Sequence, residues 1–482
     1  MAKQIALLAL AAIPATTAET ILGVYIFSRH GDRTPKALAP ANLTSLGQEQ
    51  VYQSGNHYRN KYVASDASSP IYKLSDDIAV ASQMTITSQV DTVLQSSAQA
   101  FMQGVYPPVG TLSTQELANG SSVEGTLSGY QYIPINAVAS ASSSSNAENS
   151  GWLQGSSGCG NAVVSSNNYF SSSEYLSTLN STNDFYQGLL PVINTTFSPS
   201  QASFKNGYTI YDYVHVATIH NSSIPSDDLL TNDTLNELFW LANAHEWGLA
   251  YNETDPIRAV AGATLAGQIV TQLNTTLTGK SKQPLAVQFG AYASFMSFFG
   301  LAQLQKLSDE WTGVVDYASS MVFELVADSD NVTAASYPAS SDVSVRFLFS
   351  NGSAAAAEPV AYPLFGQSET LLPWDTFVSE MNKFAIADTA DWCTACGNST
   401  GVCAEYASGS SSGSGGDTSA SSSSSGVNGI SLPVAGVIGA LVTLVVILGI
   451  EALVYLVAGL KIVKKSTLAA ASAGGASGAV KA

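Results

Sequence analysis

Two kinds of hydrophobic pattern occur along the first 400 or so residues, and they predict strands alternating with helices. The run "TILGVYIF", residues 20–27, is continuously apolar and rich in β-branched and aromatic residues, which predicts a strand buried on both faces. The stretch "DDIAVAS", residues 76–82, predicts a second buried strand, and "SVRFLFSNG", residues 344–352, predicts a strand that ends in a turn. We therefore expect an α/β fold with a mainly parallel sheet flanked by helices.

Apolar positions at helical spacing predict the helices. They occur over residues 43–63 and over residues 92–108, where Gly104 and two prolines stop the second helix. Two more helices are predicted in "LLTNDTLNELFWLANAHEWGLAYN" and "IRAVAGATLAGQIVTQLNTTL", and residues 285–304 begin as a strand and continue as a helix. Short helical patches in a stretch rich in Ser, Asn and Gly predict a smaller, mostly helical cap inserted within about residues 105–255.

Both ends of the chain carry targeting patterns. Residues 1–18 hold one lysine, an apolar run and small residues up to Ala18, which is typical of a signal peptide. An outer domain would then cover residues 19–406, followed by a flexible stalk rich in Ser and Gly over residues 407–429.

Residues 430–460 are apolar except for Glu451, and about 20 such residues span a bilayer as a helix. Lysines begin the tail at residues 461–482, which marks the tail as cytoplasmic. We place Glu451 at the membrane interface rather than in a functional site within the span. These patterns predict a single-pass protein at the plasma membrane or cell surface, with its outer domain outside the cell.

The composition agrees with an extracellular surface. Charged residues make up only 11% of the chain and the formal net charge is −18, whereas ordinary soluble proteins have about 25% charged residues. Sugar attached to Asn-x-Ser/Thr sequons would supply the missing polarity. Such sequons occur at Asn42, Asn119, Asn180, Asn194, Asn221, Asn232, Asn252, Asn274, Asn331, Asn351 and Asn398.

The four cysteines fit an oxidising compartment. Cys393, Cys396 and Cys403 lie close together in "WCTACGNSTGVC", and Cys159 stands apart in "SSGCGNA". We expect disulfides within the outer domain, and the sequence allows three pairings. Zinc binding by the cluster is the weaker interpretation, because it requires a fourth ligand from elsewhere. We expect no bound metal and no cofactor.

The stretch "RHGDRTP", residues 29–35, follows the first predicted strand, where ligands bind in open α/β sheets. It resembles the signature of the histidine acid phosphatases, the branch of the histidine phosphatase superfamily that includes fungal phytases. The following segments "LTSLGQEQVYQSGNHYRNKY", "SSAQAFMQGVYPP", "FMSFFGLAQL" and "VVDYASSMVFELV" resemble later parts of the family in the same order. The resemblance implies that His30 attacks phosphorus and forms a phosphohistidine, while Arg29 and Arg33 hold the phosphate through their guanidinium groups.

Two parts of the family pattern are missing. The family has a third phosphate-binding Arg on its second strand, and Ala81 in "IAVASQM" falls at that position. The family also has a His followed by an acidic proton donor after a later strand, and Ala291 and Tyr292 fall there in "QFGAYASFMSFFGL". We interpret His245–Glu246, in "NAHEWG", as an ordinary packing or surface pair rather than a relocated catalytic pair.

Two functional hypotheses follow. The first is a membrane-anchored, glycosylated acid phosphatase that hydrolyses phosphomonoesters through His30 at an impaired rate. The second is a non-catalytic pseudophosphatase that serves as a binding or structural module at the cell surface. Either would have phosphate or a phosphomonoester and the membrane as partners, and we expect no nucleic-acid partner.

Overall fold

A computed structural model describes residues 19–138, 158–220, 228–328, 332 and 336–407. The signal peptide, the span at residues 430–460 and the tail predicted above lie outside these residues. Among the described residues, no helix is both long and apolar enough to cross a bilayer.

One sheet organises the described chain, in the strand order β10-β8-β7-β1-β6-β2-β5, with β9 paired to β8. The strands are β1 (Glu19–Arg29), β2 (Met84–Gln89), β5 (Asn136–Val138), β6 (Leu285–Gly290), β7 (Ser320–Asp328), β8 (Val343–Ser350), β9 (Val360–Ala361) and β10 (Leu371–Pro373). Strands β1, β6, β2 and β5 are parallel, whereas β7, β8, β9 and β10 join through antiparallel pairings. The sheet is therefore mixed, which corrects the expected mainly parallel one.

The expected strand at residues 76–82 is wrong. Those residues form turns and the start of a 3-10 helix at Ala81–Gln83, and the strand begins afterwards at Met84. The pattern misled because "IAVA" is more apolar than "MTITSQ". In the fold, β2 alternates between buried and partly exposed residues up to Thr87, and its threonines suit a half-buried strand.

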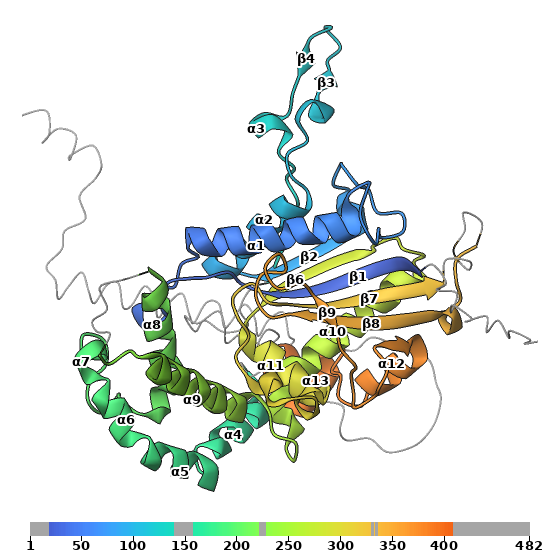
Figure 1. The fold of residues 1–482 in the computed structure, drawn as a ribbon. Helices are drawn as coiled ribbons and strands as arrows, with labels where there is room; N and C mark the ends of the chain where they lie inside the picture. The colour runs from blue at the N-terminus through green and yellow to red at the C-terminus, as the bar shows by residue number, and fades with distance from the viewer. Residues whose placement is uncertain (1–18, 139–157, 221–227, 329–331, 333–335, 408–482) are drawn as a thin grey trace, which may run out of the picture. The chain divides into compact units, whose positions relative to one another are not determined.

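Helices cover both faces of the sheet (Figure 1). The helices α1 (Ser45–Tyr58) and α2 (Thr92–Val105) pack together on one face, and α2 contacts β2 and β6. On the other face α10 (Val260–Thr278) contacts β1, α11 (Tyr292–Leu301) and α12 (Trp374–Met381). The core lies between these layers, and β1 is buried from Leu22 to Arg29.

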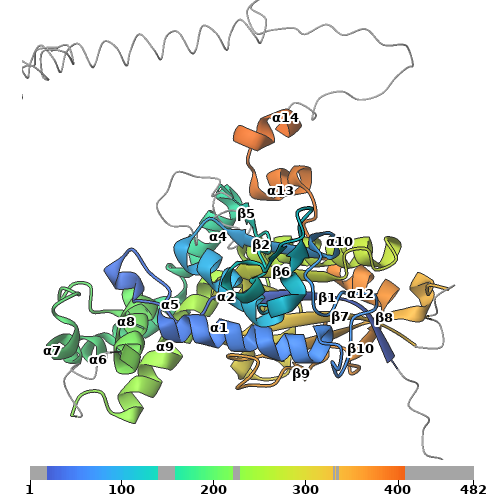
Figure 2. The same cartoon turned by 90° about the horizontal axis from the view of Figure 1, so that it is seen from above.

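A group of helices of different lengths gathers at one end of the sheet (Figure 2). They are α4 (Gly160–Tyr169), α5 (Ser173–Ser181), α6 (Asn183–Gly188), α7 (Leu190–Ile193), α8 (Gly207–His220) and α9 (Asn232–Ala250). A separate hydrophobic core holds most of this group, with Tyr186, Phe204 and Leu238 fully buried. Residues 110–130 form an arm that includes β3 (Gln115–Glu116), β4 (Ser122–Val123) and α3 (Thr126–Gly129) and projects from the sheet layer (Figure 1).

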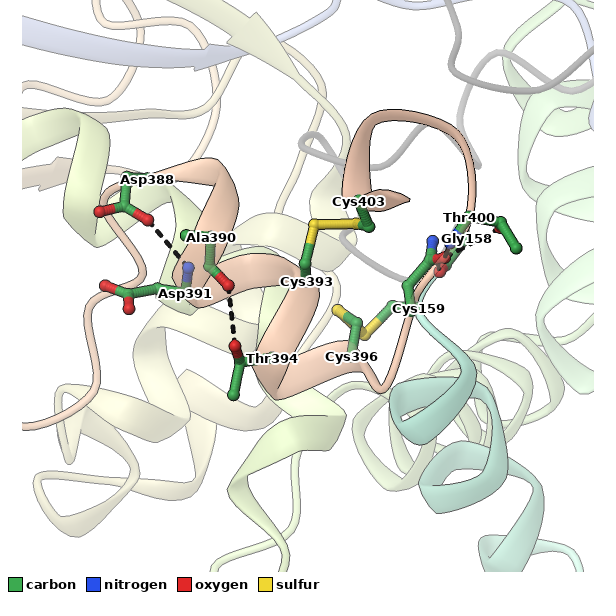
Figure 3. The surroundings of a disulfide bond; sticks show 11 residues. Gly158, Cys159, Asp388, Ala390, Asp391, Cys393, Thr394, Cys396, Thr400 and Cys403 are labelled. Atoms are coloured by element: carbon green, nitrogen blue, oxygen red, sulfur yellow. Dashed lines mark hydrogen bonds between the residues drawn. A yellow bond between two sulfur atoms is a disulfide. The ribbon is translucent and has the colours of Figure 1, made fainter. Parts of the chain in front are cut away.

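Two disulfides fasten the C-terminal part of the described chain (Figure 3). Cys159, just before α4, bonds to Cys396 at the end of α13 (Thr389–Cys396), and Cys393 bonds to Cys403. The expected disulfides are thereby confirmed, and the pairing that the sequence left open is settled. Because all four sulfurs are paired, the cluster does not offer the free thiolates that zinc requires.

Candidate active site

The signature residues lie in a loop at the C-terminal end of β1. The loop packs tightly against the first turn of α1: a Cβ added to Gly31 would lie 2.1 Å from the carbonyl oxygen of Gly47. Thr44 caps α1 by accepting from the Gly47 N–H, and its own N–H donates to the carbonyl of Asp32. The local sequence thus fixes the loop, because both contacting residues must be glycines.

His30 is buried, and its hydrogen bond sets its tautomer. Its Nδ1 lies 2.8 Å from the carbonyl oxygen of Gly31. A carbonyl oxygen only accepts, so Nδ1 carries the proton. In the neutral imidazole the lone pair then lies on Nε2, the nitrogen that a nucleophilic attack on phosphorus would use.

Arg33 forms a bidentate ion pair with Asp212 of α8. Nη2 of Arg33 lies 2.9 Å from Oδ1 of Asp212, and Nη1 donates to Oδ2 at 3.2 Å. Both side chains are at most 3% exposed. Asp212 also accepts from the backbone N–H of Lys36 at 2.8 Å. The carboxylate therefore competes with a phosphate for the guanidinium group of Arg33.

Arg29 is enclosed by aromatic rings. Its guanidinium carbon lies 4.5 Å from the ring centre of Tyr317 and 5.4 Å from that of Tyr292. Its Nη1 donates to the carbonyl of Val315, whereas its Nε finds no acceptor among the described residues. Burial raises the pKa of Tyr317 well above its ordinary value, so this phenol is neutral at physiological pH.

A second ionisable pair ties the loop to the end of α8. Oδ2 of Asp32, which is fully buried, lies 2.5 Å from Nε2 of His220 and also accepts from the hydroxyl of Thr44. Helix α8 therefore contacts the signature loop through Asp212 and through His220. Neither contact follows from the spacing of residues in the sequence.

Tyr292 contacts Glu246 at the position where the family has its acid. Ala291 ends the connection from β6, and Tyr292 begins α11. The Tyr292 hydroxyl donates to Oε2 of Glu246 at 2.6 Å, and Nδ1 of His245 lies 2.8 Å from Oε1. Burial alone would raise the pKa of Glu246, but these hydrogen bonds and the charge of Lys36 outweigh it and hold that pKa below its ordinary value. The Glu246 carboxyl group is therefore ionised: it accepts hydrogen bonds and holds no proton that it could give to a leaving group.

Ala81 lies at the wrong end of its strand to face the site, which corrects the expectation from sequence. Met84 pairs with Leu285 at the start of β6, whereas Arg29 pairs with Gly290 at its end. Continuing this register places Gln89, not Ala81, level with Arg29. Gln89 is fully buried, and neither its Oε1 nor its Nε2 has a hydrogen-bond partner among the described residues.

A small cavity lies next to Arg29. It has a volume of about 20 Å³, room for about one water molecule, and its lining includes Arg29, Asp212 and Tyr317 but neither His30 nor Arg33. Within the described part of the chain, no three His, Cys, Asp or Glu side chains are grouped so as to hold a metal ion.

Sequence reasoning found Arg29, His30 and Arg33 but missed Asp212. This residue is the only acid in "GYTIYDYVHVATIH", the otherwise apolar and aromatic sequence of α8. A single acid on such a helix is a signal for a buried partner, because an unpaired buried charge is costly.

One family of known proteins matches most of this chain. The family described as "Histidine phosphatase superfamily (branch 2)" has a sequence profile that matches residues 38–350 of this chain, a range that begins just after the signature. The chain belongs to this superfamily.

Individual relatives are distant. Lysosomal acid phosphatase from Xenopus laevis is 24% identical over 372 residues, covering 73% of this chain and 74% of the relative. Among solved structures, the tartrate complex of Hafnia alvei phytase has a TM-score of 0.50 at 13% identity and covers 79% of this chain and 99% of the other. The phytase from D. castellii gives 0.50 at 13% identity, covering 79% and 82%. These structural likenesses establish the fold alone.

Proposed function

We propose that this chain is a glycosylated, single-pass protein of the cell surface whose outer domain hydrolyses phosphomonoesters far more slowly than an ordinary phosphatase. The observation that carries this proposal is the buried Arg33–Asp212 ion pair. The ion pair makes Asp212 a competitor of any oxyanion for the guanidinium group of Arg33.

Displacing Asp212 from Arg33 is energetically unfavourable. Breaking a buried ion pair by removing one partner destabilises a protein by about 3–5 kcal/mol, because the remaining charge is left uncompensated. A phosphate that replaced Asp212 would leave that carboxylate buried beside a dianion. Binding of substrate and of the transition state would both weaken.

The leaving group also lacks a suitable acid. The Tyr292 hydroxyl donates its hydrogen bond to Glu246, and the lowered pKa of Glu246 keeps that carboxyl group ionised. Loss of a general acid lowers the rate by roughly 10²–10⁴-fold, and loss of one transition-state donor by roughly 10²–10³-fold. These losses are not multiplicative, because the groups act together.

The tautomer of His30 favours this slow hydrolysis over the alternative, a non-catalytic pseudophosphatase that serves as a binding or structural module at the cell surface. Nδ1 donates to the Gly31 carbonyl, so Nε2 retains the electron pair that attacks phosphorus. The bond from Nε2 to phosphorus would form while the ester P–O bond breaks. Water would then hydrolyse the phosphohistidine and release phosphate.

Exposure of the sequons supports the glycosylated surface location. None of the sequon asparagines within the described residues is buried. The apolar run at residues 430–460 supports the anchor, although no described residue belongs to it. Membrane fractionation of the full chain and of a variant lacking residues 430–460 tests the anchor, since only the shortened chain should be released as a soluble protein.

The catalytic proposal is tested with the full chain purified in detergent and a generic aryl phosphate at mildly acidic pH. We expect turnover at least roughly 10²-fold below a typical enzyme value of about 10 s⁻¹. His30→Ala identifies the source of any remaining rate: a further loss supports slow phosphohistidine chemistry, and no loss supports a non-catalytic module. An ordinary rate that His30→Ala abolishes would refute the proposal.

A further inference from the structure

A second cavity lies beside the candidate active site and has a different chemistry. It has a volume of about 530 Å³ and is bounded by α9, the segment around residues 307–315, and the end of β8. We call it the aromatic cleft and define it by Phe239, Trp240, Trp311, Phe349 and Tyr362, all of which line it.

The walls of the aromatic cleft are ordered by contacts among their rings. The Trp311 ring centre lies 4.8 Å from that of Tyr362 and 5.1 Å from that of Phe349. On the opposite side, α9 contributes Phe239 and Trp240, whose ring centres are 5.5 Å apart. Trp240 is 54% exposed, so a large aromatic surface stays open at this edge. Ser308 and Glu310 add exposed polar groups to the lining.

Asn351 also lines the aromatic cleft, and it belongs to the sequon Asn351-Gly352-Ser353. Its Oδ1 accepts from the backbone N–H of Asp316 at 2.8 Å and from the hydroxyl of Ser319 at 3.2 Å. Its Nδ2, the atom that N-glycosylation modifies, donates to no protein atom within the described residues. The amide is therefore held in place with the reactive nitrogen available.

Other sequons differ in this respect. Nδ2 of Asn398 donates to the carbonyl of Gly158 at 2.9 Å, and Nδ2 of Asn42 donates to the carbonyl of Pro40 at 3.1 Å. Each of these nitrogens keeps a second hydrogen, so the hydrogen bonds do not exclude attachment of sugar there. Asn119 lies in the exposed turn of the arm and does not line the aromatic cleft. A glycan at Asn119 therefore serves as the reference that has no contact with the aromatic cleft.

We propose that Asn351 carries an N-linked glycan whose first sugar docks in the aromatic cleft. This inference rests on the proposed secretory, glycosylated outer domain. In the covalent step, Nδ2 forms a bond to the anomeric carbon of an oligosaccharide carried on a polyprenyl diphosphate. The bond from that carbon to the diphosphate oxygen breaks, the diphosphate leaves, and the amide loses one proton to solvent.

The fit follows from the shape and polarity of a sugar ring. Its C–H faces are apolar and pack on aromatic faces by dispersion, while its hydroxyl edges need polar partners such as Ser308 and Glu310. Phe349 lies near the end of β8, two residues before Asn351, and both residues line the aromatic cleft. Covalent attachment keeps the sugar at high effective concentration next to the aromatic cleft, so even weak contacts are enough to hold it there.

The first test maps the sugars on the full chain made in a secretory host. Glycopeptide mass spectrometry should find Asn351 and Asn119 occupied. An endoglycosidase should then release the Asn351 glycan from native protein at least about tenfold more slowly than the Asn119 glycan, which is about 1.4 kcal/mol of protection. Both should be released at equal rates after unfolding in denaturant.

Matched variants assign the protection to the aromatic cleft. Trp240→Ala should speed release at Asn351 and leave Asn119 unchanged; because Trp240 is largely exposed, this change spares the core. Asn351→Gln and Ser353→Ala remove the sugar through different atoms, and both should shift tryptophan emission in the same direction.

Three results would overturn the inference. If Asn119 is glycosylated and Asn351 is not, no glycan is present to bind in the aromatic cleft. The inference then fails, and the proposed surface location still stands. If Asn351 is occupied but released as fast as Asn119, its glycan is simply exposed. If no sequon is occupied, both the inference and the proposed glycosylated location fail.

Discussion

The carboxylate of Asp212 determines how readily Arg33 in the signature loop binds phosphate. Asp212→Asn should free the fork of Arg33 while keeping an oxygen for the Lys36 N–H. We expect tighter binding of inorganic phosphate, by about tenfold or more, together with about 3–5 kcal/mol lower stability without phosphate. Calorimetric titration and urea unfolding measure these two effects. Unchanged phosphate affinity would show that Asp212 does not block the site.

The register of β2 distinguishes two candidate positions for a missing arginine. Ala81→Arg should leave phosphate affinity unchanged, because Ala81 is exposed and lies at the far end of β2. Gln89→Arg should raise phosphate affinity, because it places a cation level with Arg29, and phosphate should in turn raise the melting temperature of this variant. Equal effects of the two changes would contradict the placement of Gln89 level with Arg29.

His215 supplies a pH dependence at the residue scale. Burial lowers the pKa of His215 and Arg29 adds to this, with Asp316, Asp212 and Asp32 opposing. The unfolded chain therefore takes up this proton near its ordinary pKa of about 6.5, before the folded state does. The neutral imidazole of His215 contributes its full stabilisation above about pH 6.5. This contribution is lost as the pH falls towards the lower pKa that His215 has in the folded chain.

His215→Phe, which can keep the stacking on Tyr211, should lose less stability on acidification than the native chain. Urea unfolding at a series of pH values below about 6.5 measures the difference. A constant difference between the two chains across this range would contradict the prediction, and above about pH 7.5 a constant difference is what we expect.

At the scale of elements, the sequence predicts those whose burial pattern is extreme. Strand β1 and the β6–α11 connection are continuous apolar runs, so they stand out. Strand β2 was misplaced because half-buried strands with threonines resemble polar segments. Strand direction in β7 and β8 could not be predicted, because both strands are mostly buried and hydrophobic periodicity does not encode direction.

The residues of the candidate site also differ in whether the sequence could predict them. Arg29, His30 and Arg33 lie within one short motif and could be found from the sequence, whereas Asp212 and His220 reach the loop only because α8 packs there. Gln89 could be assigned only from the pairing of β2 with β6. Contacts between distant segments depend on tertiary packing, which a local pattern does not contain.

The contact between the signature loop and α1 gives a prediction for an element. A Cβ at Gly47 would lie 2.0 Å from the carbonyl oxygen of Asp32. Gly47→Ala should destabilise the protein by about 1–3 kcal/mol or more, because backbone must move. Gly188→Ala is the control, because a Cβ there meets nothing within 4 Å, and it should change stability by less than about 1 kcal/mol. Chemical unfolding of both variants tests this, and similar losses would argue against a tight contact.

At the scale of the whole molecule, the two disulfides differ in the length of chain they close. Cys159–Cys396 spans 237 residues and Cys393–Cys403 spans 10. Loop entropy predicts about 5 kcal/mol of stabilisation from the first and about 3 kcal/mol from the second. Unfolding of paired Cys→Ser variants measures both, and a larger loss from the short loop would contradict the entropic account.

The longer disulfide also determines how the domain carries a mechanical load. The described chain ends at Ala407, just beyond Cys403. A pull on that end passes through Cys403 to Cys393, along the last turn of α13 to Cys396, and then to Cys159 at the start of α4. In a chain tethered by its C-terminal end, shear forces would therefore fall on covalent bonds and the helices around α4. As long as both bonds stay oxidised, they would share this load with the backbone that leads from α13 back to α12 and β10.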